Sequence, residues 1–306
     1  MAGKTPTPMT AQKAAALAKA QAAAKGQLER GSPRARGVER TEEALEWVYK
    51  WGWSTPTILE INAGTFRSGL AARLEKNGFL NRIQAPSGGI NSTPSFLLTL
   101  TEKGFEEAVR ITDKLLQYET DPHRINLKNV THDEIVQRLT ALRTWGDGGE
   151  QIFEYLTPKN LASWKVDQIK IPDAIWKVDL NGETKTVAIE VELTPKFGVE
   201  FDRFVNMVAG LVDGRNVGQD KTKSIFDGVE IFSKSPALIR KYRASLSDGS
   251  KIPTWKKEPG KTGRWKKVLD KTGNPIYISI TKQASEKINF TLLTPQMLEV
   301  PKGRFC

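Results

Sequence analysis

Three carboxylates lie close together in a segment of the chain that has the pattern of a β-hairpin. The segment covers residues 170–196, and Asn181-Gly182 at its centre is the dipeptide most typical of a two-residue hairpin turn. With this dipeptide as the loop, Asp173 is predicted to lie directly opposite Glu190. Because side chains alternate along a strand, Asp173, Glu190 and Glu192 are expected on one face of the hairpin, with apolar side chains on the other.

These three carboxylates predict a metal site. Like charges that face each other across two strands repel, so a bound cation or a proton is needed to make the arrangement stable. Carboxylate oxygens are the ligands that Mg²⁺ and Mn²⁺ prefer, and both ions assist phosphodiester chemistry. We therefore expect Asp173, Glu190 and Glu192 to bind Mg²⁺ or Mn²⁺. The alternative is a solvated acidic edge on an ordinary hairpin.

The same residues resemble the motif of the PD-(D/E)XK nuclease superfamily. The resemblance consists of Pro172-Asp173, the hairpin, and Glu190-Val191-Glu192. Most members of the superfamily have lysine where this chain has Glu192, and a minority share the ExE ending found here. The resemblance implies a restriction-endonuclease-like domain with a mixed sheet, of the α/β (α+β) class. Lys196 is the candidate to replace the missing lysine.

A helix is predicted to precede the hairpin, and it supplies two further candidates. Thr131 and Glu134 have the spacing of a capping box, which gives Glu134 a structural role. Nucleases of the resembled superfamily often contribute an acid from such a helix, so Glu134 and its neighbour Asp133 are also candidate ligands. His132 lies at the start of the same helix and is a candidate catalytic residue.

The composition favours a nucleic-acid partner. The chain has 46 Lys and Arg against 35 Asp and Glu, a net charge of +11, and a pI near 9.6. Its one cysteine, Cys306, and its two histidines argue against disulfides and against zinc enzymes. Because no apolar run approaches the length of a membrane span and no signal peptide is visible, we expect a cytoplasmic protein without a membrane partner.

The N-terminal part divides into a basic arm and a predicted DNA-binding domain. Residues 1–40 are rich in alanine, with four lysines and four arginines against two glutamates. This composition predicts a disordered arm, which either contacts nucleic-acid phosphates without sequence preference or has no binding role. Residues 41–120 have the pattern of three helices, a two-stranded hairpin and a further helix, which resembles a winged helix-turn-helix. In that family the third helix enters the major groove. The candidate DNA contacts on it are Thr65, Phe66, Arg67, Ser68 and Arg73. The alternative is a winged helix that contacts only protein.

Residues 128–306 are predicted to form the nuclease-like domain. Beyond the hairpin, strands alternate with helices, as in α/β layering. The segment 251–267 then has seven basic residues, with two tryptophans among them, and this mixture suits a strand of nucleic acid whose bases stack on the rings. The alternative is a flexible surface loop. The candidate contacts are Lys256, Lys257, Arg264 and Lys266.

The order of the two domains, over residues 41–235, resembles the MobC-type relaxases and the wider replication-relaxation family of mobile elements. This resemblance implies a metal-dependent endonuclease that nicks DNA at a plasmid origin of transfer or replication. It also implies double-stranded and single-stranded DNA, and relaxosome or replication proteins, as partners. The alternative is a non-catalytic, sequence-specific DNA-binding protein, either a replication initiator or a repressor, with a degenerate nuclease fold.

Overall fold

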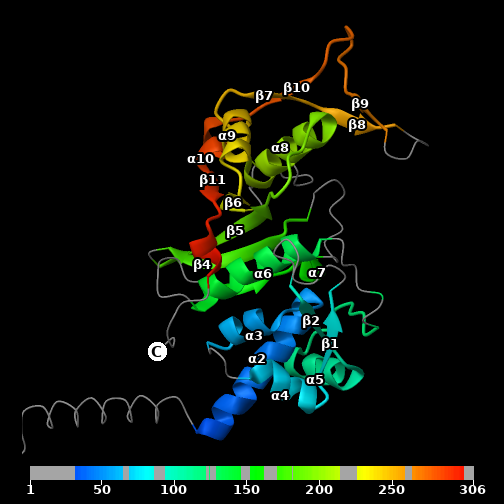
Figure 1. The fold of residues 1–306 in the computed structure, drawn as a ribbon. Helices are drawn as coiled ribbons and strands as arrows, with labels where there is room; N and C mark the ends of the chain where they lie inside the picture. Colours follow the sequence, from blue (N-terminus) through cyan, green and yellow to red (C-terminus); the bar gives the residue numbers. More distant parts are fainter. Residues whose placement is uncertain are drawn as a thin grey trace, which may run out of the picture.

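The chain folds into a helical N-terminal part and a larger part built on a five-stranded mixed sheet (Figure 1). This arrangement confirms the predicted mixed α/β class. The computed structural model describes residues 32–64, 69–85, 94–121, 124, 129–145, 152–161, 171–180, 182–213, 226–258 and 264–299.

The N-terminal part begins earlier than the sequence predicted. The Ser32 hydroxyl accepts the Ala35 N–H at 3.1 Å, which caps a helix that starts at Pro33. The prediction of a disordered arm as far as residue 40 is therefore wrong for residues 33–40, and residues 1–31 lie outside the described residues. The elements that follow are α2 (Pro33–Trp51), α3 (Pro56–Asn62), α4 (Leu70–Lys76), β1 (Leu80–Gln84), β2 (Phe96–Leu100) and α5 (Glu102–Thr112).

The order of these elements matches the predicted three helices, hairpin and helix. Thr55 accepts the Ile58 N–H at 3.3 Å, and Pro56 occupies the first turn of α3, as expected for a capped helix start. Strands β1 and β2 pair in antiparallel fashion, with Leu80 opposite Leu100. Helices α2 to α5 and the hairpin enclose one apolar core.

The central sheet has the order β11-β6-β5-β4-β3. Strands β5, β6 and β11 are parallel, whereas β3 and β4 are antiparallel to their neighbours. Helix α8 (Gly198–Asp213) makes the crossover between the parallel strands β5 and β6, as such a connection requires. The strands are β3 (Ile152–Leu156), β4 (Ala174–Leu180), β5 (Glu183–Val191), β6 (Gly228–Ser233) and β11 (Ile288–Leu292).

Both faces of the sheet are covered: the predicted grouping of apolar side chains on one face is confirmed, whereas the expectation that the face with Glu190 and Glu192 is not part of a core is wrong. Trp176, Ile189 and Val191 pack on the α6 side. Ile175 and Ala188 pack on the opposite side, under the other helices. The covering helices are α6 (Val130–Trp145) on the first face, and α8, α9 (Pro236–Ser245) and α10 (Lys282–Glu286) on the second, while α7 (Pro158–Leu161) and α11 (Pro295–Leu298) are short connections.

The basic segment after α9 forms an extended ribbon, seen at the top of Figure 1, and not the flexible loop that was the alternative prediction. One pair of its strands is β7 with β10, and the other is β8 with β9. Residues 259–263, between β8 and β9, lie outside the described residues. The strands are β7 (Lys251–Pro253), β8 (Trp255–Lys257), β9 (Trp265–Lys267) and β10 (Tyr277–Ser279).

The N-terminal part is docked on the sheet domain through polar and aromatic contacts. Trp47 Nε1 donates to Gln137 Oε1 at 3.1 Å, and its ring lies 5.0 Å from the ring of Tyr155. The Thr157 hydroxyl donates to the Lys50 carbonyl at 2.7 Å. No helix within the described ranges is long and apolar enough to cross a membrane.

Candidate active site

The hairpin register follows the sequence prediction along most of its length. Leu180 pairs with Glu183, and Ala174 pairs with Ile189, in one unbroken antiparallel ladder. At the turn, Gly182 has a φ of +85°, in the left-handed region that glycine adopts readily. The turn chemistry therefore sets which residues of the two strands meet.

A bulge at the start of β4 changes the position of Asp173. The Asp173 N–H donates to the Ile189 carbonyl at 3.0 Å, although Ile189 is already the partner of Ala174. Two residues of one strand thus lie opposite one residue of the other, which is the pattern of a β-bulge and redirects side chains. Asp173 is therefore not directly opposite Glu190, and this detail of the prediction is wrong.

The Asp173 carboxylate is held on the α6 side by a histidine and a backbone amide. Its Oδ2 accepts the Val191 N–H at 2.8 Å and lies 3.1 Å from His132 Nε2. The same nitrogen lies 3.0 Å from the Val191 carbonyl oxygen. On the other edge of the ring, Nδ1 lies 2.9 Å from Asp133 Oδ1. The imidazole therefore lies between two carboxylates, and two oxygen atoms meet at its Nε2.

The protonation state of His132 follows from these neighbours. Burial by itself would lower the pKa of His132, but the hydrogen bonds and charges of Asp133 and Asp173 outweigh burial and raise it to about 10. The ring is then a cation at neutral pH, and both of its nitrogens donate. The positive charge expected beside Asp173 is therefore supplied by a side chain of the protein.

The other two predicted carboxylates lie on the opposite face of the sheet. Glu190 is 0% exposed and Glu192 is 3% exposed, both on the side covered by α8 and α9. The Glu192 carboxylate forms an ion pair with Lys196 and accepts the Tyr242 hydroxyl at 3.4 Å. The Ser233 hydroxyl donates to the Glu192 carbonyl at 2.6 Å. Both the side chain and the main chain of Glu192 are thus fixed.

Tyr242 contacts Glu192 and feels the charge of Glu190. Burial raises the pKa of Tyr242, and the negative charges of Glu192 and, more weakly, Glu190 raise it further. The hydroxyl therefore keeps its proton and can donate to Glu192. The ring is packed against Phe201 and Phe204, with centroid distances of 5.4 and 5.0 Å. The site on this face is a pair of buried acids with one lysine and one tyrosine donor.

The bulge separates the three predicted metal ligands into two groups. Within the described part of the chain, no three His, Cys, Asp or Glu side chains are grouped so that they could hold a metal ion. The chemistry of the donors still fits a hard cation, because Glu190 and Glu192 offer carboxylate oxygens on one face at the end of β5. Asp173 lies on the other face, with His132, and is not grouped with these two carboxylates.

Glu134 lies elsewhere, at the boundary with the N-terminal part. Helix α6 begins at Val130, one residue before Thr131, so the predicted capping box is wrong. Glu134 instead forms an ion pair with Arg138, one turn further along α6, and lines a cavity of about 240 Å³. Burial raises the pKa of Glu134, and the charge of Arg138 acts in the opposite direction. The structure thus brings Glu134 to Arg138 and not to Asp173.

Of the five predicted DNA-contacting residues of the N-terminal part, only Arg73 is among the described residues. Arg73 is exposed on α4, as a groove-facing residue should be. Gly69, in a left-handed conformation, precedes this helix, which therefore begins later than the amphipathic pattern predicted. The remaining candidates, Thr65, Phe66, Arg67 and Ser68, lie outside the described residues.

The ribbon exposes its cations and holds its tryptophans against the domain. Trp255 Nε1 donates to Asp202 Oδ2 at 3.0 Å, and the Arg203 guanidinium lies 3.7 Å from the Trp265 ring centroid. Both partners are on α8, so the rings anchor the ribbon to that helix. Glu258 lies within 3.1 Å of Arg264 and 3.5 Å of Lys266. The four predicted contacts, Lys256, Lys257, Arg264 and Lys266, are exposed.

Sequence reasoning missed Tyr242, Ser233 and Arg203. Tyr242 shares the buried face of α9 with Leu238, four residues earlier, so its helical spacing is a usable signal. Ser233 meets Glu192 only because β5 and β6 pair in parallel, and the sequence does not specify that pairing. Arg203 is one of many surface cations, and only the folded ribbon shows which ring it covers.

Comparisons with known proteins give no assignment. No family model matches the chain, and no match was found among curated proteins or among solved structures.

Proposed function

We propose that this chain is a metal-dependent DNA endonuclease, a relaxase-like nickase of a mobile element. One observation carries the proposal: Glu190 is completely buried beside Glu192 at the end of a central strand. A buried carboxylate costs folding free energy, so two of them in the same place are not explained by stability. Buried acids of this kind concentrate at functional sites.

In this proposal Glu190 and Glu192 would hold Mg²⁺ or Mn²⁺ on one face of the sheet, and Asp173, the third predicted ligand, lies on the other face with His132 and would not bind the same ion. When bound, the ion would supply the charge that activates water and stabilises the phosphate in the transition state. Lys196 offers a point charge beside Glu192. His132 orients Asp173 through Nε2 and holds a proton there.

DNA recognition is assigned to the N-terminal part and to the ribbon. We infer that α2 to α5 with the β1–β2 hairpin act as a winged helix, with Arg73 on the helix that would enter the major groove. The exposed cations of the ribbon would contact phosphates. The net charge of +11 supports a nucleic-acid partner. By the resemblance in the sequence, the substrate is a plasmid origin of transfer or replication, in double-stranded or single-stranded form, with relaxosome or replication proteins as partners.

A second candidate is a non-catalytic DNA-binding protein with a degenerate nuclease fold. A specific observation favours it: Asp173 and Glu192 each have a cationic partner in the protein itself, His132 and Lys196. Acids that are neutralised in this way need no metal ion for stability. The two candidates differ in what Mn²⁺ does to the protein.

Plasmid nicking tests the endonuclease. The wild type is expected to nick supercoiled plasmid DNA with Mg²⁺ or Mn²⁺ and to be inactive with EDTA. Glu190→Gln should abolish nicking and keep DNA binding, because Glu190 is buried whereas the proposed DNA contacts are exposed. Glu154→Gln is the matched control, since Glu154 is an exposed acid of the same sheet, paired with Lys177. Equal nicking by wild type and Glu190→Gln would reject the assigned site.

Thermal unfolding distinguishes the two candidates without an activity assay. A ligand that binds only the folded state stabilises it by about 2.7 kcal/mol at a hundredfold excess over its Kd. Mn²⁺ should therefore raise the Tm of wild type and Glu154→Gln, and leave that of Glu190→Gln unchanged. Sequence-specific DNA binding together with no Mn²⁺ shift and no nicking would establish the second candidate instead.

A further inference from the structure

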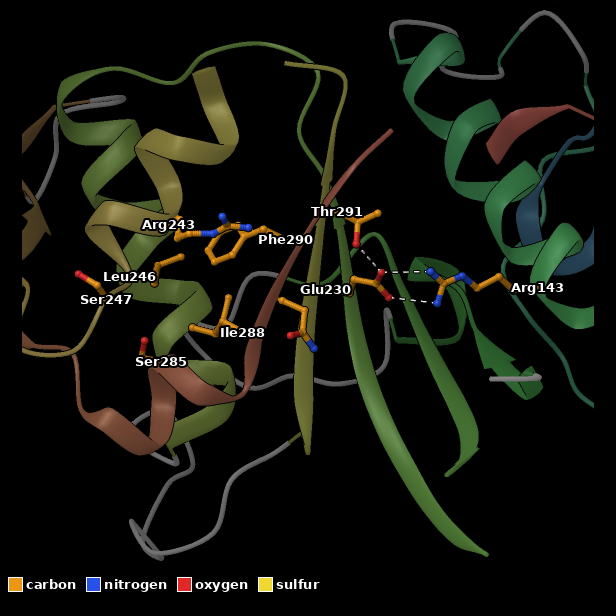
Figure 2. A pocket seen from close by; sticks show the side chains of 10 residues that line it. Arg143, Glu230, Arg243, Leu246, Ser247, Ser285, Ile288, Phe290 and Thr291 are labelled. Carbon is orange, nitrogen blue, oxygen red and sulfur yellow. Dashed lines mark hydrogen bonds and ion pairs between the residues drawn. The ribbon is translucent and has the colours of Figure 1, made fainter. Parts of the chain in front are cut away.

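A cleft lies at an edge of the sheet, away from the buried acids. It has a volume of about 770 Å³ and follows β11, which pairs only with β6 among the described strands (Figure 2). Open strand edges are normally shortened, charged or covered, because another chain can pair with them. Here the edge strand has five residues, and its Leu292 side chain is 41% exposed.

The backbone of β11 directs hydrogen-bonding groups toward this cleft that have no partner in the described part of the chain. The Val229 N–H donates to the Lys287 carbonyl, and the Leu293 N–H donates to the Ser233 carbonyl, at 2.9 and 2.8 Å. Residues 287, 289, 291 and 293 therefore direct their backbone groups to β6. Because the direction alternates along a strand, Ile288, Phe290 and Leu292 direct theirs away from the sheet. These groups specify an extended polypeptide as the ligand, since only another strand matches their spacing.

The two walls of the cleft differ in chemistry. Figure 2 shows Arg143, Glu230 and Thr291 on one side of β11, with Arg243 and Phe290 on the other. Arg143 donates to both Glu230 oxygens at 3.1 and 3.3 Å, and the Thr291 hydroxyl donates to one of them at 3.0 Å. This wall is a closed, neutral network. A strand added to β11 would place alternate side chains against the two walls.

The second wall carries a net positive charge. Arg243 is exposed on α9, with its guanidinium 5.4 Å from the Phe290 ring centroid. No carboxylate in the described ranges forms an ion pair with Arg243. The cleft therefore complements an acidic side chain, which a guanidinium binds through charge-assisted hydrogen bonds.

We propose that the β11 edge binds an extended segment of a partner protein that carries an acidic side chain, which adds a sixth strand to the sheet. The terminal segments of this chain are poor candidates, because residues 1–31 have five basic residues and one acidic residue, and residues 300–306 have two basic residues and no acid. Nucleic acid lacks the amide pattern that the strand edge matches. This surface is independent of the proposed nuclease site.

A synthetic peptide tests the proposal on the full chain. The probe is fluorescein-labelled Thr-Val-Glu-Thr-Glu-Val-Thr, and the control probe has lysine in place of glutamate. Arg243→Gln should weaken binding about tenfold, the order of one charge-assisted hydrogen bond. Arg240→Gln is the matched control, since Arg240 is exposed on the same helix outside the cleft, and its effect should stay within about twofold.

A second pair of variants tests the backbone pairing. Leu292→Pro removes an outward N–H and leaves the β6 ladder intact, so it should abolish binding, whereas Leu292→Ala should retain it. Thermal unfolding reports whether the proline variant folds; if it does not, the Arg243 variant and the lysine probe decide. No saturable binding, equal binding of the lysine probe, or binding unaffected by Arg243→Gln would overturn the proposal. A concentration-dependent dimer in sedimentation that Arg243→Gln disrupts would make a second copy the occupant and also overturn it.

Discussion

The two sides of the sheet at the end of β5 neutralise their acids in different ways. On the α6 side Asp173 is paired with His132, whose ring is fixed by hydrogen bonds on both of its edges. On the α9 side Glu192 is paired with Lys196, whose long side chain is 29% exposed and lies 4.5 Å from the Phe204 ring centroid. The first cation is part of a network that includes the backbone, and the second is on a flexible stem.

This difference bears on where a metal ion would enter. Lys196 can move its ammonium into water without breaking any backbone hydrogen bond. His132 cannot move without breaking its contact with the Val191 carbonyl. We therefore expect an incoming cation to displace Lys196 before it displaces His132. Removal of the cation is expected to cost more free energy of unfolding in the Glu192–Lys196 pair than in the Asp173–His132 pair.

The largest effect is expected from Lys196→Met. Glu192 is nearly completely buried, and removal of the partner of a buried charge leaves that charge uncompensated. We expect a loss of about 2 to 4 kcal/mol in the free energy of unfolding, measured with urea. Lys185→Met is the matched control, since Lys185 forms an exposed ion pair with Glu183, and both residues are on β5. There the loss should stay below about 0.5 kcal/mol.

The double variant Lys196→Met/Glu192→Gln separates charge from packing. A neutral amide at position 192 removes the buried charge, so the double variant should be more stable than Lys196→Met alone. If the double variant is no more stable than Lys196→Met, loss of packing against Phe204 explains the effect. The difference between the Glu192–Lys196 and Asp173–His132 pairs would then not be electrostatic.

A smaller loss is expected from His132→Ala. Asp173 is 16% exposed and keeps the Val191 N–H, so water can replace the imidazole at its carboxylate. The expected loss is about 1 to 2 kcal/mol by urea unfolding. Asp133→Asn, which keeps the ring and neutralises the more exposed acid, should cost less. A loss for His132→Ala greater than for Lys196→Met would reverse the ranking.

The sequence predicted the hairpin well because its determinants are local. The turn dipeptide and the alternation of side chains set the register from Ala174–Ile189 to Leu180–Glu183, and the ladder has that register. The capped start of α3 at Pro56 is equally local. Such features depend on residues adjacent in the chain, so a single sequence contains them.

The candidate site was predicted less well because it depends on tertiary contacts. The bulge that turns Asp173 toward His132 forms where α6 crosses the end of the hairpin, and no turn residue marks it. The Ser233 contact with Glu192 requires the parallel pairing of β5 with β6. The capping box failed for a different, local reason: α6 begins at Val130, before Thr131, and Glu134 is paired with Arg138 one turn further along the same helix.

The smallest effect on stability is expected at Glu43, a glutamate that lies near another acid, Glu39. Glu43 is half-buried on α2, and burial, followed by the charge of Glu39, raises its pKa from 4.5 to about 7, which Arg40 offsets only in part. Because the pKa is higher in the folded state, the folded protein binds the proton more tightly, and stability falls as pH rises from 4.5 to 7. Above pH 7 the full cost of the charged form is present.

Glu43→Gln should therefore raise the free energy of unfolding at pH 8, by up to about 1 kcal/mol once solvent screening is allowed for. At pH 4.5 and below, the carboxyl is protonated in the folded state, so the variant and the wild type should have nearly equal stability. Urea unfolding at pH 4.5, 6 and 8 gives the measurement, with Glu42→Gln as control because Glu42 lies near Arg110. A gain of the same size at all three pH values would mean that the amide improves packing and that the charge of Glu43 does not lower stability, so that Glu43 would not differ from the neutralised acids Asp173 and Glu192.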